Sequence, residues 1–73
     1  MKTGIRIQVS GTGHVGLAVY GLLGKELALL MDEYKAPRLY RVEFDGANLA
    51  SGVYICRMTA GSFIRSIKML LLR

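Results

Sequence analysis

The feature that most constrains the fold of this chain is an alternation of apolar and polar residues with a period of two. In Ile5–Val9 every second residue is apolar, and Arg6 and Gln8 lie between them. The segments Val15–Val19 and Tyr40–Phe44 repeat the apolar row. Successive side chains of a strand point to opposite faces, so each segment is predicted to be a half-buried β-strand.

Two further segments complete a strand-rich chain. Val53–Met58 is apolar on both faces apart from Arg57, which is typical of a strand in the middle of a sheet. Phe63–Arg73 is expected to be the last strand. Turn signals separate the strands at Gly11–Gly13, Gly21–Gly24, Pro37, Asp45–Asn48, Ser51–Gly52 and Thr59–Ser62. Short strands with turns at this spacing predict an all-β antiparallel sandwich.

The length of 73 residues allows one small domain, spanning residues 1–73. A complete dinucleotide-binding domain needs roughly 100 to 200 residues, so a whole enzyme of that class is excluded. We expect a domain of marginal stability alone, because so short a chain buries little apolar surface. We interpret it as a piece of a longer protein.

Composition narrows the function classes. The single cysteine, Cys56, predicts no intrachain disulfide, and no apolar stretch approaches the ~20 residues of a membrane span. Arg6 and Gln8 interrupt the apolar core that a signal peptide would need at the N-terminus. The net charge of +5 is scattered, so we expect solvated strand faces and no nucleic-acid partner. The basic residues are Lys2, Arg6, Lys25, Lys35, Arg38, Arg41, Arg57, Arg65, Lys68 and Arg73.

One motif competes with the sandwich. Gly11, Gly13 and Gly16 have the G-x-G-x-x-G spacing of a dinucleotide site, and the start resembles nucleotide-sugar dehydrogenases. Asp32 lies about where the ribose-binding acid would be. The required helix would contain two glycines, Gly21 and Gly24, each costing ~1 kcal/mol relative to alanine.

The alternative treats Ser10–His14 as the turn of a hairpin between Ile5–Val9 and Val15–Tyr20, with glycines supplying positive φ angles. This interpretation accounts for the same glycines without a ligand and fits the strand-rich remainder of the chain. We therefore favour it and predict no cofactor and no small-molecule substrate.

No set of nucleophile, base and orienting group is visible, so we predict that the chain is not an enzyme. His14 is expected to be an exposed turn residue rather than a catalytic or metal-binding one. Asp45 is expected to bond nearby backbone N–H groups in a turn. Cys56 follows Tyr54 by two positions, as in the tyrosine corner of immunoglobulin (Ig) domains, and should be a buried thiol. The predicted core comprises Leu17, Val19, Val42, Phe44, Tyr54 and Cys56.

A family resemblance covers roughly Ile5–Arg73. The order of "VYGLLGKELALL", "YRVEFDGANLASGVYICRMTAG" and the terminal "KMLLLR" resembles the type A C-terminal sorting domain of proteins exported by the bacterial type IX secretion system. The pattern is also similar to the Ig-like domain of the flagellar hook-capping protein. Its most specific structural positions are Gly24, Phe44, Asp45, Leu49, Gly52, Tyr54 and Gly61.

The resemblance implies a small Ig-like β-sandwich of about seven strands at the end of a larger cargo, which is not part of this chain. It implies a non-catalytic address that the outer-membrane translocon recognises in the periplasm and a surface sortase removes, leaving the cargo at the cell surface or released. Recognition would involve the last strand, Lys68, Met69, Leu70, Leu71, Leu72 and Arg73. The last strand of a sheet offers unpaired backbone groups to a partner. A plain Ig-like accessory module of a surface protein is the alternative.

Overall fold

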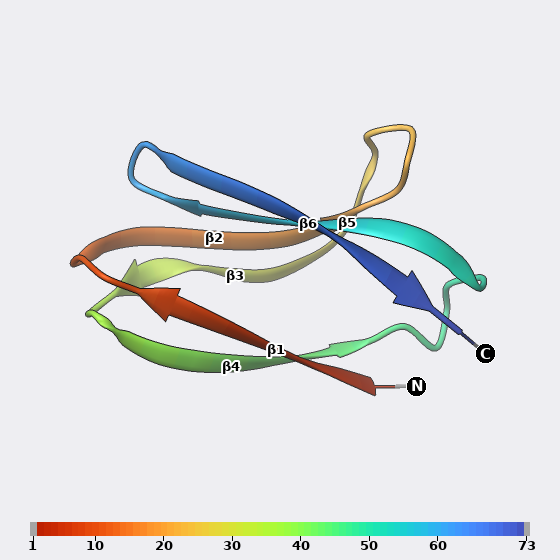
Figure 1. Ribbon diagram of the computed structural model, residues 1–73, viewed down its shortest axis with the longest axis horizontal. Coiled ribbons are helices and arrows are strands. Elements are labelled where there is room, and N and C mark those ends of the chain that lie inside the picture. The colour runs from red at the N-terminus through yellow and green to blue at the C-terminus, as the bar shows by residue number, and fades with distance from the viewer. Residues whose placement is uncertain (1, 73) are drawn as a thin grey trace.

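Every segment with the period-two pattern forms a strand in the computed structural model, which describes residues 2–72 and only the backbone of Lys2 (Figure 1). The strands are β1 (Lys2–Val9), β2 (Gly13–Tyr20), β3 (Glu26–Lys35), β4 (Arg38–Asp45), β5 (Gly52–Ala60) and β6 (Phe63–Leu71). No helix occurs within residues 2–72. The predicted all-β class is confirmed.

The strands form two antiparallel sheets that face one another. One sheet has the order β3-β2-β5-β6, and the other contains only β1 and β4 (Figure 1). Pairing on both edges makes β5 an interior strand, as its two apolar faces predicted. The expected number of about seven strands is wrong, because the described residues form six.

The predicted hairpin between the first two strands is also wrong. β1 pairs with β4, whereas β2 pairs with β3 and β5, so residues 10–12 cross from one sheet to the other. His14, expected in the turn, is the second residue of β2. The period of two fixes which face of a strand is buried but not which strand lies beside it. The apolar faces of two strands are buried equally well when the strands lie in opposite sheets of a sandwich and when they are neighbours in one sheet.

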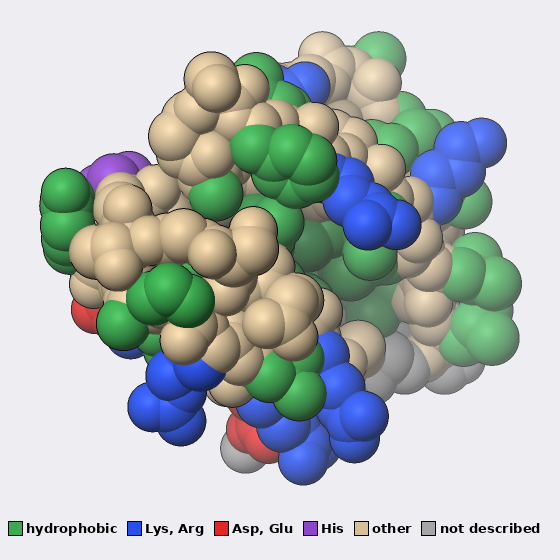
Figure 2. All heavy atoms as spheres, turned by 60° about the vertical axis from the view of Figure 1, so that its left-hand side comes forward, with side chains coloured by type: hydrophobic (Ala, Val, Ile, Leu, Met, Phe, Trp, Pro, Cys, Tyr) green, Lys and Arg blue, Asp and Glu red, His purple; other side chains and the backbone are tan. Residues whose placement is uncertain are grey.

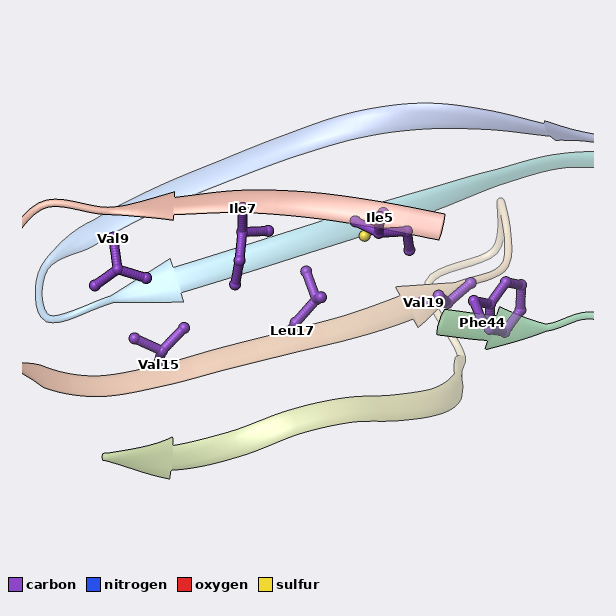
Figure 3. Packing of buried hydrophobic residues seen from close by; sticks show 8 residues of the cluster. Ile5, Ile7, Val9, Val15, Leu17, Val19 and Phe44 are labelled. Carbon is purple, nitrogen blue, oxygen red and sulfur yellow. The ribbon is translucent and has the colours of Figure 1, made fainter. Parts of the chain in front are cut away.

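The core lies between the two sheets. In Figure 3 the labelled side chains of β1 and β2 point toward one another, with Phe44 of β4 at one end of the row. Four predicted core residues, Leu17, Val19, Phe44 and Cys56, are buried. Val42 and Tyr54 are partly buried and pack against the same cluster. The predicted core is therefore confirmed.

The third glycine of the dinucleotide-like motif has a packing role. Gly16 lies inside β2 opposite Thr59 of β5, and a Cβ atom at Gly16 would come within 2.7 Å of the Thr59 hydroxyl oxygen. A dinucleotide fingerprint requires this glycine to open a helix. Residue 16 instead continues a strand of an antiparallel sheet, so the dinucleotide-binding fold is wrong for this chain.

Two tyrosines tie the connecting segments to the strands that follow them. The Tyr54 hydroxyl, near the start of β5, donates to the Ala50 carbonyl oxygen at 2.6 Å. The Tyr40 hydroxyl, near the start of β4, donates in the same way to the Ala36 carbonyl oxygen. The Tyr54 bond has the geometry of a tyrosine corner. Each bond fixes the angle at which the chain enters its strand.

Candidate functional site

The strand in which the resemblance predicts recognition, β6, lies at an edge of the four-stranded sheet. It pairs with β5 from Phe63 opposite Ala60 to Leu71 opposite Gly52, and no described strand pairs with its other edge. Its side chains alternate between the face toward the core and the outer face. The six residues predicted for recognition are therefore divided between two environments.

The inward-facing members of this set are structural. Leu71 is 3% exposed, and Met69 is half-buried and packs against the core cluster. Leu71 packs on Gly46, just after β4, where an added Cβ atom would come within 2.9 Å of the leucine side chain. The close approach at Gly46 thus connects the end of β6 to the opposite sheet.

The outward-facing members form an exposed row, which we call the terminal row: Lys68, Leu70 and Leu72. Leu70 is 68% exposed and Leu72 is 63% exposed. Arg73, the last predicted recognition residue, lies outside the described residues. The terminal row therefore combines one ammonium group with two apolar side chains that make little contact with the rest of the domain.

Neighbouring side chains extend this surface. Val53, opposite Leu70 on β5, is 37% exposed. Arg57 of the same strand lies over the Tyr20 ring at 5.2 Å from its centroid, and its Nε donates to the Ser66 hydroxyl oxygen at 3.5 Å. The outer face of β5 and β6 thus presents apolar side chains beside two cations, Arg57 and Lys68.

The structural positions singled out by the resemblance support the fold around this strand. Gly24 and Gly61 have φ angles of 91° and 61° in the turns before β3 and β6, a region that favours glycine. Asp45 Oδ1 accepts a hydrogen bond from the Ala47 N–H at 3.0 Å, which confirms its predicted turn role. Leu49 packs against the core, and Gly52 begins β5.

Sequence reasoning missed one pair of ionisable side chains. The Nε2 of His14 lies 2.5 Å from Asp32 Oδ1, and both side chains are more than half exposed. The turn between β2 and β3 brings the two strands together, and His14 and Asp32 lie diagonally across their ladder. The turn signal at Gly21–Gly24 could have predicted this pairing of the two strands, and with it the pair of side chains. The exposed pair resembles a cross-strand ion pair.

Cys56 is 3% exposed and belongs to the core cluster. Desolvation by burial raises the pKa of its thiol. A thiol that is both buried and protonated is a poor nucleophile, so its position favours packing over reactivity.

Within residues 2–72, no cluster of His, Cys, Asp or Glu side chains has an arrangement able to hold a metal ion. The same residues contain no helix with the length and apolar character needed to cross a membrane. Comparison with protein-family models, curated proteins and solved structures finds no match to this chain.

Proposed function

We propose that this chain is a non-catalytic C-terminal sorting domain that directs an attached cargo through the type IX secretion system. The translocon of the outer membrane recognises the folded domain in the periplasm, and a surface sortase then separates it from the cargo. The cargo is left at the cell surface or released. The observation that carries the proposal is the exposed terminal row at a free sheet edge.

The chemistry of this row suits recognition by a protein partner. An unpaired strand edge supplies backbone donors and acceptors, and the apolar side chains of Leu70 and Leu72 supply surface that a partner can bury. Lys68 adds a charge that limits indiscriminate pairing at the edge. The sandwich and the tyrosine corner support the same family resemblance.

The test is an export assay in a cell that has a type IX system. A reporter is placed behind a signal peptide and in front of residues 1–73, and its surface fraction is measured. We expect the intact domain to carry the reporter to the surface, and Lys68→Glu combined with Leu70→Ser to leave it in the periplasm. These side chains are exposed, so the variant should remain folded.

Point substitutions are better here than deleting residues 68–73, because that deletion also removes the buried Leu71, and we expect the loss of its packing to destabilise the domain. Lys25→Glu is the matched charge control, since this exposed lysine lies between β2 and β3, away from the row. If the folded intact domain reaches the periplasm and the reporter stays there, the sorting proposal fails. A plain accessory module would then take its place.

A further inference from the structure

A groove opens between β1 and β6 on the side of the sandwich where the two-stranded sheet ends. Its volume is about 700 Å³. One wall is the free edge of β1, the floor is the inner face of β5 and β6, and residues 10–13 and Gly61 surround one end. Figure 2 shows a hollow of this character, with apolar side chains at its floor and Lys or Arg side chains at its rim.

The floor is apolar but uncovered. Phe63 and Ile67 lie on the inner face of β6, yet they are 54% and 49% exposed. Further along the same face Met69 is half-buried and Leu71 is buried. The inner face of β6 is therefore covered at the Leu71 end and exposed at the Phe63 end.

The accessible surface of the whole chain is larger than a typical folded monomer of its mass exposes. A folded monomer of this mass exposes about 4,450 Å². This chain exposes 5034 Å² at 8.0 kDa. The excess of roughly 600 Å² approaches the ~800 Å² that one partner buries in a specific interface.

The position of the gap suits a strand. β1 pairs with β4 on one edge, and no described strand pairs with its other edge. A free strand edge offers unpaired backbone donors and acceptors to an added strand. An added strand beside β1 would hydrogen-bond to it and place alternate side chains on Phe63 and Ile67.

Charge indicates what kind of strand fits. Arg65 lies between Phe63 and Ile67 on the floor and has no ion-pair partner among residues 2–72. None of the described lining residues is acidic. A second copy of this chain, with a net charge of +5, would be repelled by this cation. An acidic strand would complement it.

We propose that this groove binds an extended segment of a different polypeptide, which adds to β1 as a third strand of the smaller sheet. The segment runs antiparallel to β1, carries alternating apolar side chains toward Phe63 and Ile67, and places a carboxylate against Arg65. This surface is separate from the terminal row, and the inference does not depend on sorting.

The test uses an end-blocked peptide of eight residues, the length of β1. Threonine and valine alternate along the peptide, so that the valines face the groove. Glutamate replaces the valine at the position that would face Arg65. Calorimetric titration should give binding about tenfold or more tighter than for the same peptide with lysine in place of glutamate, as a charged hydrogen bond predicts. In Arg65→Glu the preference should reverse. Lys25→Glu, which changes the net charge equally, should keep the original preference.

Strand addition makes a second prediction. N-methylation of the amides on one edge of the peptide should abolish binding, and N-methylation on the opposite edge should not, because only one edge faces β1. Three results would overturn the proposal. The first is no binding of the glutamate peptide at millimolar concentration, and the second is equal binding of the glutamate and lysine peptides. The third is self-association of the chain without peptide, measured by sedimentation, that the peptide does not disrupt.

Discussion

Leu70 and Leu71 are neighbours in the sequence but lie in opposite environments, since one is 68% exposed and the other 3% exposed. We predict that Leu71→Ala lowers the free energy of unfolding by about 2–4 kcal/mol, because it leaves a cavity against Gly46. Leu70→Ala should change it by at most ~0.5 kcal/mol. Urea denaturation of both variants measures the difference, and equal losses would contradict the assigned faces of β6.

The hydroxyl of Tyr54 can be tested separately from its ring. Tyr54→Phe keeps the packing and removes the bond to the Ala50 carbonyl, so we expect a loss of about 1 kcal/mol in unfolding free energy. Tyr54→Ala should cost ~3 kcal/mol or more, as large aromatic truncations do. Tyr34→Phe is the control, because Tyr34 is 74% exposed. A Tyr54→Phe variant as stable as the parent in urea would show that the corner contributes nothing.

Burial of Cys56 predicts a pH dependence. Because the pKa of the folded thiol is raised, the native state keeps a proton that the unfolded chain releases more readily. The associated stability is fully present below the unfolded pKa, about 8.5, and is lost as the pH rises through the higher folded pKa. Thermal denaturation from pH 7 to pH 10 should therefore show a steeper loss for the parent than for Cys56→Ala. Parallel curves would mean that the thiol is solvated.

At the scale of elements, the sequence predicted the strands better than their partners. Period two and the turn residues located five of the six described strands, including the interior position of β5, because both signals are local, but they did not predict β3. The partner of β1 is not local, so the hairpin prediction failed. The sequence likewise did not predict which residues at the end of β6 are exposed. Met69–Leu72 are all apolar, so alternation does not distinguish the inward-facing side chains from the outward-facing ones.

The ladder between β2 and β5 makes its own prediction. Gly16→Ala should destabilise the domain by about 1–3 kcal/mol, because the new methyl group meets the Thr59 hydroxyl. In the background of Thr59→Ala, which removes that hydroxyl, the same change should cost at least ~0.5 kcal/mol less. A double-mutant cycle by urea denaturation measures the coupling. Purely additive losses would indicate that Gly16 is required for another reason.

At the scale of the molecule, the all-β antiparallel sandwich follows from patterning, but the uncovered floor does not. Phe63 and Ile67 occupy positions that alternation alone predicts to be buried, and they are exposed because no described strand covers that end of β6. The groove exists because no described strand lies beside the second edge of β1, and the apolar period of a strand does not predict which strands lie beside it. The sequence analysis therefore predicted recognition along Lys68–Arg73 and did not predict the open groove on the inner face of β6.

The uncovered floor of the groove also limits the free energy of unfolding of the domain. A core of side chains as small as Val9, Val15 and Val19, in a chain of this length, rarely supplies more than about 3–5 kcal/mol. We predict an unfolding free energy within or below that range for residues 1–73 alone, measured by urea denaturation. A ligand that binds only the folded state raises the free energy of unfolding, by about 2.7 kcal/mol at a concentration of one hundred times its dissociation constant. The glutamate peptide should therefore raise the urea midpoint of the parent and not that of Arg65→Glu. A parent domain stable by more than ~8 kcal/mol without peptide would show that the small sheet already completes the core and that the open floor has little energetic consequence.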